Sequence, residues 1–329
     1  MWVVGGSLAS LLAILNIAKC IVALPAEFQR PTPASYASAV NLTGLQSIVD
    51  PGFHIDTDYG YDKIKGVQAY MNTVLAAQEL AMLDYMGAET ERDFQYDGYR
   101  DVTIHVRGAP VSRIRRRYAL WGLLSSIAAL ARRPRFVSAS FPLFMNNRPV
   151  GTVSYRGPDT PGAAGEVPAT TSNHPVEEGD TGADSSLYTP VSYRRRDLPP
   201  VTNQTPAASV KEREGQLVVI PHWLDKSVFV RDFFLAAVGG IVQAAANDKD
   251  QKLRSFIINL REFDSKIWAE TPEEVPEFPM RYEDAINGLV ELVTQAVKDS
   301  SFNEVGAHMF WRVGGQDTYM GRLWILSYE

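Results

Sequence analysis

The same order of helix-like and strand-like segments occurs twice along this chain, and the duplication limits the fold more than any other feature of the sequence. Four segments of residues 67–155 recur in the same order within residues 227–328. The matched pairs are Val74-Leu-Ala-Ala with Phe234-Leu-Ala-Ala, residues 100–107 with 254–261, residues 119–124 with 285–290, and the hairpin ends 151–155 with 321–328. Length differences fall between the segments, where loops tolerate them. Each copy therefore predicts a helix, a strand, a helix and two strands.

The spacing of apolar residues supports these segments. The two second helices repeat apolar residues at the i, i+3, i+4, i+7 spacing of an amphipathic helix. These residues are Leu120, Leu123, Leu124, Ile127 and Leu130 in the first copy, and Ile286, Leu289, Val290, Val293 and Val297 in the second. The first strands alternate instead, with Val102, Ile104 and Val106 on one face and Phe256, Ile258 and Leu260 on the matching face.

A small sheet with helices on one face buries only that face, so a single copy needs a partner surface. We therefore predict an α+β fold of two tandem αβαββ repeats, residues 61–156 and 216–329, which form antiparallel sheets packed with helices. The order of elements resembles that of a ferredoxin-like plait. Repeat 1 is expected to associate with repeat 2.

The N-terminus predicts export from the cell. Residues 3–18 form an uncharged apolar run, shorter than the roughly 20 residues that a membrane-spanning helix needs, and small residues follow it. We assign residues 1–23 to a signal peptide and 24–60 to an N-terminal extension; the alternative is a retained membrane anchor. Cys20 is the only cysteine, so disulfides cannot stabilise the secreted chain. Asn41 and Asn203 lie in glycosylation sequons, as in a glycoprotein.

The segment between the repeats, residues 157–215, is rich in Pro, Gly, Ser, Thr and acidic residues, and it predicts a disordered linker. Within it, Arg194, Arg195 and Arg196 form a basic run that suits a kexin-type processing protease; a solvated charge run is the alternative. Two units around an excisable segment resemble the layout of fungal killer-toxin precursors. Those domains are cross-linked by disulfide bonds between cysteines, whereas this chain has only one cysteine.

The two repeats carry opposite charges on matching segments. Residues 107–135 hold eight arginines and no acid, whereas residues 261–301 hold ten acids and four basic residues. Three interpretations are open: the repeats pair through these charges, the basic segment meets an anionic or protein partner, or both faces are simply solvated. The external partner would bind through Arg113, Arg115, Arg116 and Arg117. The net charge of −6 argues against a nucleic-acid partner.

The sequence contains no HExxH, GxSxG, P-loop or GxGxxG motif, and its five histidines lack metal-ligand spacing. We assign no catalytic residue and expect no metal or cofactor. The polar residues on the two matched strands, His105 and Arg107 with Asn259 and Arg261, are candidate binding residues. The leading hypothesis is a secreted, fungal effector-like or toxin-like protein that binds rather than catalyses. The alternative is a secretory-pathway enzyme or metabolite carrier with a polar pocket over the sheet.

Overall fold

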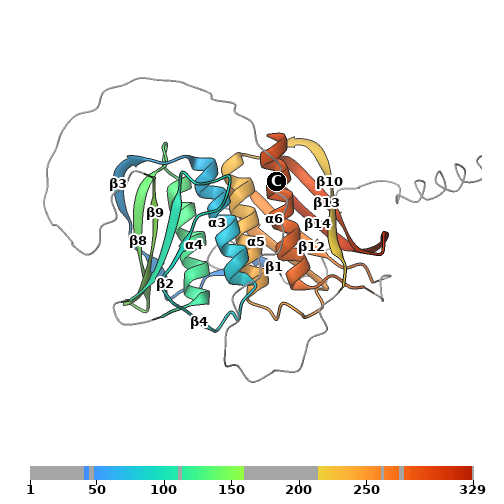
Figure 1. Ribbon diagram of the computed structural model, residues 1–329, viewed down its shortest axis with the longest axis horizontal. Helices are drawn as coiled ribbons and strands as arrows, with labels where there is room; N and C mark the ends of the chain where they lie inside the picture. The colour runs from blue at the N-terminus through green and yellow to red at the C-terminus, as the bar shows by residue number, and fades with distance from the viewer. Residues whose placement is uncertain are drawn as a thin grey trace, which may run out of the picture. The chain divides into compact units, whose positions relative to one another are not determined.

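The fold is described from a computed structural model for residues 41–43, 48–109, 113–158, 214–260, 263–273 and 278–327 (Figure 1). These residues all belong to one compact unit, Ala39–Glu329. The predicted signal peptide, Asn203, Arg194–Arg196 and nearly all of the predicted linker lie outside the described residues. The same holds for Arg261 and for the side chain of Asn41.

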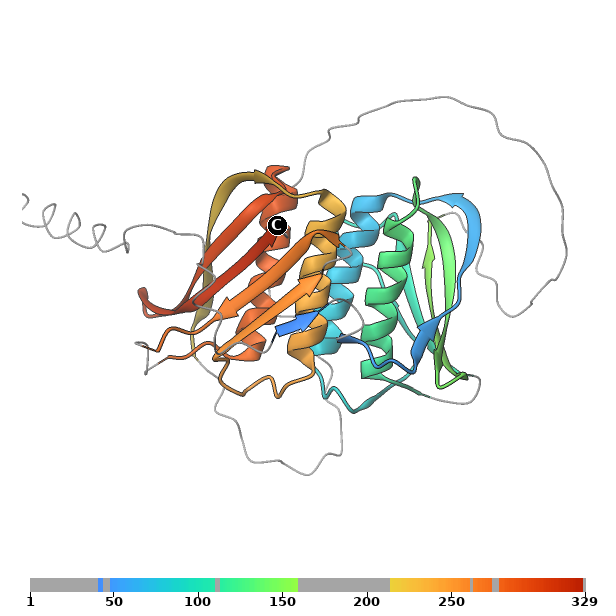
Figure 2. The ribbon, with the colours of Figure 1, turned by 180° about the vertical axis from the view of Figure 1, so that it is seen from behind.

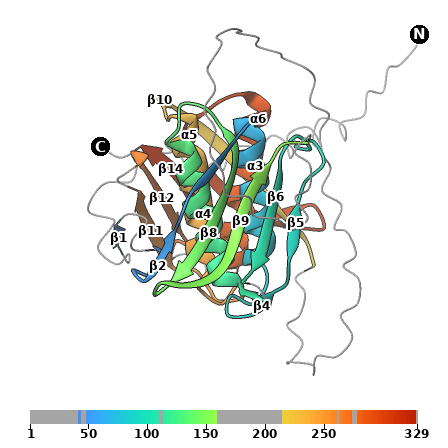
Figure 3. The ribbon, with the colours of Figure 1, turned by 90° about the vertical axis from the view of Figure 1, so that its left-hand side faces the viewer.

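The first unit is a sheet with two helices on one face. Its elements are β2 (Phe53–Ile55), β3 (Asp58–Lys63), α3 (Gly66–Ala81), β4 (Ala88–Glu89), β5 (Arg92–Phe94), β6 (Thr103–Gly108), β7 (Ile114–Arg115), α4 (Arg116–Ala131), β8 (Val137–Met145) and β9 (Arg148–Arg156). The sheet order is β2-β8-β9-β6-β5, with β3 also paired to β8, as Figure 3 shows from its outer side. Since β2 and β3 belong to this sheet, the first unit begins before the predicted boundary at residue 61.

The second unit repeats this plan with longer strands. Its elements are β10 (Gln216–Ser227), α5 (Val230–Ala245), β11 (Ser255–Leu260), β12 (Ser265–Glu270), α6 (Tyr282–Asp299), β13 (Asn303–Val313) and β14 (Gln316–Ser327). The sheet order is β1-β11-β12-β14-β13-β10, in which β1 (Asn41–Thr43) runs parallel to β11. Figure 2 shows β1 beside the strands of this second sheet.

The predicted α+β fold of two sheet–helix units is confirmed. In each unit two strands flank a central one and are joined through a helix: β6-α4-β8 around β9, and β12-α6-β13 around β14. This split β-α-β arrangement is the one that a ferredoxin-like plait contains. The predicted apolar faces of α4 and α6 are buried, as are Val102, Ile104 and Val106 in the first sheet.

One predicted match between the repeats is wrong. The sequence pattern predicts that residues 100–107 match residues 254–261. The first range includes most of β6, and the second includes β11. The sheets place β6 between β9 and β5, whereas β12 takes the corresponding position between β14 and β11. The counterpart of β6 is therefore β12. The error arises because β6 and β11 both carry apolar residues at alternate positions, and that pattern does not tell which strand lies nearer the centre of a sheet.

The helices of the two units pack against each other, with α3 contacting α5 and α6, and α4 contacting α5 (Figure 1). Near the beginnings of α3 and α5, the ring of Tyr70 in α3 stacks on that of Phe234 in α5, with centroids 4.6 Å apart. Farther along α3, the amide of Gln78 donates a hydrogen bond of 2.8 Å to Asn287 of α6. The buried apolar residues of both units consequently form one continuous core.

Small residues allow the close approach of α5. A Cβ atom added to Gly240 would lie 2.6 Å from the Cδ1 atom of Ile267 in β12 and 2.7 Å from that of Leu289 in α6. Glycine therefore lets α5 pack closely against its own sheet and against the neighbouring helix.

In the first unit, the buried hydroxyl of Tyr155 joins the sheet to both helices by hydrogen bonds, to Thr73 of α3 at 3.0 Å and to Ser126 of α4 at 3.2 Å. Burial raises the pKa of Tyr155 to about 12.

Within the described part of the chain, no helix is both long enough and apolar enough to cross a membrane.

Candidate functional site

Four arginines gather where α4 begins, and we call Arg113, Arg115, Arg116 and Arg117 the basic corner. Ile114 holds this segment in place: its side chain is 1% exposed, and it packs so closely on Gly151 that a Cβ atom there would lie 2.7 Å from the Cδ1 of Ile114. In an extended segment the neighbours of an inward residue point the other way. Arg113 and Arg115 are accordingly exposed on either side of Ile114.

The other two arginines of the basic corner are engaged by their own repeat. Arg116 donates through Nε to Glu89, 2.9 Å away, and both side chains are largely buried. Arg117 donates to the hydroxyl of Tyr118 at 2.8 Å, and its guanidinium lies 4.7 Å from the centre of that ring. These contacts fix the start of α4. By contrast, Arg113 and Arg115 make no ion pair with any described residue.

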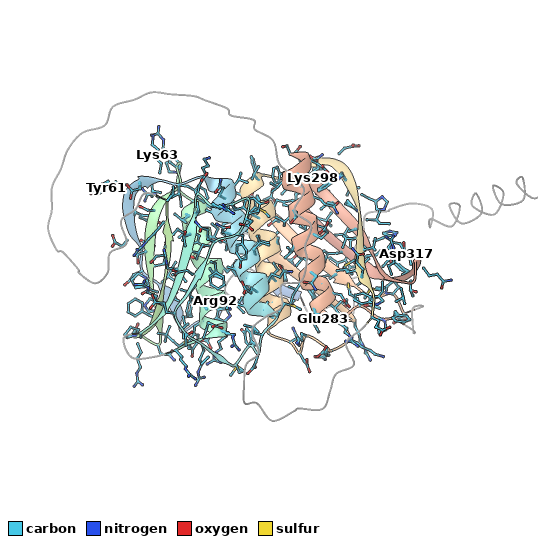
Figure 4. All side chains as sticks on the ribbon, viewed as in Figure 1. Tyr61, Lys63, Arg92, Glu283, Lys298 and Asp317 are labelled. Atoms are coloured by element: carbon cyan, nitrogen blue, oxygen red, sulfur yellow. The ribbon has the colours of Figure 1, made fainter. Side chains whose placement is uncertain are left out.

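The basic corner also opposes the dipole of its own helix. The N-terminal end of a helix carries partial positive charge, which acidic residues stabilise and basic residues oppose. Helix α6 follows this rule, with Glu283 in its first turn and Lys298 in its last (Figure 4). Helix α4 has no acidic residue in its first turn and begins directly after Arg115. A bound anion would relieve this repulsion.

The candidate binding residues of the first sheet lie on its outer face. The Nδ1 atom of His105 is 2.5 Å from a carboxylate oxygen of Asp93 in β5. Arg107 pairs with Glu91 at 2.7 Å. Since Ile104 and Val106 are the residues of β6 that face the helices, His105 and Arg107 do not line a space between the sheet and the helices.

The four candidate binding residues do not form one group. Asn259 lies on β11, in the other sheet, and is 9% exposed. Arg261 lies outside the described residues. Because β6 and β11 hold different positions in their sheets, the expected equivalence of His105 with Asn259 does not hold.

Sequence reasoning missed a histidine pair on the outer face of the second sheet. His222 of β10 and His308 of β13 lie on adjacent antiparallel strands, with ring centroids 5.2 Å apart. Burial, followed by the neighbouring His222 and Arg322, lowers the pKa of His308 to about 4. Alternation along each strand could have placed both rings on the outer face, but their register depends on the pairing of β10 with β13.

A buried carboxyl group also lies where the repeats meet, and no pattern in the sequence indicates it. Asp232, in the first turn of α5, is 1% exposed. One of its oxygens accepts a hydrogen bond of 2.8 Å from Arg231, while the other is buried without a partner. Burial is the main cause that raises the pKa of Asp232, and the charge of Asp264 adds to it. Tyr70 of the first repeat lies close enough to interact electrostatically with both Asp232 and Arg231.

Within the described ranges, no three His, Cys, Asp or Glu side chains lie close enough together to hold a metal ion.

Comparisons with known proteins give no family. No protein-family model matches the sequence, and no curated protein matches it. Among solved structures, the chain is similar to the tandem DUF26 ectodomain of the cysteine-rich receptor-like protein PDLP8 from Arabidopsis thaliana. The identity is 10%, over 83% of this chain and 96% of that chain, and the TM-score is 0.22. A structural similarity of this size does not support an inference about function. The function is therefore inferred from the geometry of the chain itself.

The buried carboxyl group predicts how stability depends on pH. The pKa of Asp232 is higher in the folded chain than in the unfolded chain, so its proton stabilises the fold below the unfolded value near 3.8, and this contribution is lost as pH rises through the folded value. We therefore expect the Asp232→Asn variant to gain stability relative to the parent as pH rises from 4 to 7. Urea unfolding of both proteins across this range measures the difference. A difference that stays constant with pH would contradict the assignment.

Proposed function

We propose that the protein is secreted and acts by binding an anionic partner, in the manner of an effector- or toxin-like protein, rather than by catalysis. The observation that carries this proposal is the pair Arg113 and Arg115, which are exposed, make no ion pair with a described residue and flank the start of a helix whose first turn has no acid. The chemistry that suits them is a surface with closely spaced anionic groups, such as a sulfated glycan or an acidic lipid headgroup.

The surrounding structure supports this choice of surface. Two acids at and just after β4, the strand that pairs with β7, are already paired, Glu89 with Arg116 and Glu91 with Arg107. Neither of these two carboxylates pairs with Arg113 or Arg115. Ile114 anchors the backbone between the two arginines, which lowers the backbone entropy that this segment loses when a ligand binds.

The alternative is an enzyme or carrier that uses a polar pocket over the sheet. It rests on His105 and Arg107, which lie on the outer face and are paired with Asp93 and Glu91. A ligand would have to displace these acids before it could reach either side chain. The geometry therefore favours the binding protein.

We further propose that the exported chain is cut in the linker at Arg194–Arg196, as its basic run indicates. The helix contacts between the repeats, Tyr70 with Phe234 and Gln78 with Asn287, support this step because they do not depend on the linker. A cut chain would keep both repeats and the basic corner together.

Binding to heparin and to vesicles of acidic phospholipid tests the anionic partner and separates its two sources. We expect Arg113→Glu with Arg115→Glu to weaken binding of the preferred probe by about tenfold, which corresponds to roughly 1.4 kcal/mol. Arg148→Glu with Arg254→Glu is the matched control, because both arginines are exposed and the change in net charge is the same. Equal weakening by the two double variants, or no binding of either probe by the parent, would refute the proposed partner.

Mass spectrometry of the secreted protein tests export and processing together. We expect a chain that begins after the signal peptide and a second chain that begins after Arg196, and a single chain in the variant Arg195→Ala with Arg196→Ala. One intact chain that begins at Met1 would rule out both steps. A parent-like pair of chains from the variant would rule out this cleavage site.

A further inference from the structure

Four helix termini meet at one end of the folded unit. Helices α3 and α5 both begin there, because Tyr70 and Phe234, whose rings stack, are each the fifth residue of their helix. Helix α4 ends there, since the ring of Phe136, which follows it, lies 5.1 Å from that of Tyr70. Helix α6 ends there as well, because the ring of Phe302, just beyond it, lies 5.8 Å from that of Phe234. We call this end, made of residues 61–67, 132–135, 225–231 and 298–301, the Phe229 end.

Exposed apolar side chains gather at the Phe229 end. The described residues leave eight large apolar side chains exposed, and four of them lie here: Tyr61, Val67, Phe229 and Val230. Phe229 is 73% exposed, although phenylalanine is a residue that proteins usually bury. Val67 and Val230 lie about one turn before the stacked rings of their helices, so they occupy neighbouring helix starts. Exposed apolar groups gathered in this way mark an interaction surface.

Basic residues surround these apolar side chains. The four segments of the Phe229 end hold three acids, Asp62, Asp225 and Asp299, and eight basic residues, Lys63, Lys65, Arg132, Arg133, Arg135, Lys226, Arg231 and Lys298. Three further acids lie beside them: Asp101 pairs with Lys65, Asp232 accepts a hydrogen bond from Arg231, and Asp264 follows Phe263, whose ring lies under the guanidinium of Arg132. The end remains basic. Figure 4 shows Tyr61, Lys63 and Lys298 at this end, and Arg92 and Glu283 at the opposite end.

We infer that the Phe229 end docks onto an anionic lipid bilayer, with Phe229 and its apolar neighbours inserted among the headgroups. Proteins that lie at a membrane surface combine apolar side chains, which enter the boundary between headgroups and acyl chains, with basic residues, which attract anionic lipids. The Phe229 end carries both. The inference goes beyond the proposed function, because it adds a second surface and uses none of the residues of the basic corner.

A bilayer fits this surface better than the other partners do. A second copy of the chain would bring two basic ends together, and like charges that face each other oppose association. A soluble polyanion would attract the basic residues, but it would leave Phe229 in water. A bilayer satisfies the charge and the apolar side chains together. Helix α4 separates the two basic surfaces by 16 residues, or roughly 24 Å, so a single bilayer surface does not reach both.

Vesicle binding by the full-length protein tests the Phe229 end. The probes are vesicles of phosphatidylcholine alone and of phosphatidylcholine mixed with phosphatidylserine in equal parts, and co-sedimentation measures their binding. We expect the mixed vesicles to bind about tenfold more tightly than the neutral ones, because basic residues attract anionic lipids. Phe229→Ser should weaken binding to the mixed vesicles by about tenfold, because serine gains little on leaving water. Val313→Ser, at an apolar residue that is 47% exposed outside this end, is the matched control and should bind as the parent does.

A charge reversal tests the electrostatic part of the surface. Lys63→Glu with Lys298→Glu should weaken binding to the mixed vesicles by about tenfold. Arg148→Glu with Arg254→Glu changes the net charge equally at exposed arginines elsewhere, and it should not. Arg113→Glu with Arg115→Glu should bind the mixed vesicles as the parent does. Vesicle binding that depends on Arg113 and Arg115 but not on Phe229 would support the proposed function and overturn this inference, so the two failures are distinguishable.

The remaining outcomes also decide. No binding of the mixed vesicles by the parent, equal binding of both kinds of vesicle, or equal effects of Phe229→Ser and Val313→Ser would overturn the inference. The apolar run of residues 3–18 is common to all variants, so it cannot produce a difference between them. A parent of twice the expected mass that becomes monomeric in Phe229→Ser would overturn the choice of partner, since the Phe229 end would then pair with a second copy.

Discussion

The packing of the helices of one repeat against those of the other is the interaction on which the structure depends. Each sheet is covered by two helices on one face only, and two helices alone leave their far sides apolar. Where α3 meets α5, Tyr70 and Phe234 cover these apolar sides, and each is 4% exposed or less. The chain has one cysteine, so packing of this kind has to supply the stability that disulfides give to many secreted proteins.

This shared core decides which surfaces remain for recognition. The inner faces of both sheets and the apolar sides of α3, α4, α5 and α6 are occupied. What remains are the outer faces of the sheets, their edges and the helix ends. The basic corner is a helix end, where Ile114 turns its two neighbouring arginines outward.

Periodicity in the sequence predicts local structure well here because burial imposes it directly. The apolar positions of α4 and α6, such as Leu123 and Leu289, are buried as their spacing indicates. Sheet position is a different matter, since β6 and β11 carry similar alternation but hold different places. Pairing of strands far apart in the chain decides that, and no local pattern encodes it.

The same limit explains the candidate sites. The charge of the basic corner is visible in the sequence because its arginines are neighbours along the chain. The sequence does not reveal the His222–His308 pair or the surroundings of Asp232, because both form between segments that only the fold brings together. Alternation along β6 indicates which face carries His105 and Arg107, but their acidic partners, Asp93 in β5 and Glu91 just before it, come from a strand that the repeat pattern does not contain.

Cutting the chain between the repeats tests the shared core most directly. A protease site inserted between residues 159 and 213 allows the purified protein to be cleaved into two fragments. If the helix contacts hold the repeats together, the fragments will co-elute at the size of the intact chain. Phe234→Ala should separate them or shift them to lower stability, since loss of a buried phenylalanine typically lowers the free energy of unfolding by about 3–5 kcal/mol. Phe229→Ala, at a residue 73% exposed just before the same helix, should not. Fragments of the parent that elute separately would contradict the account.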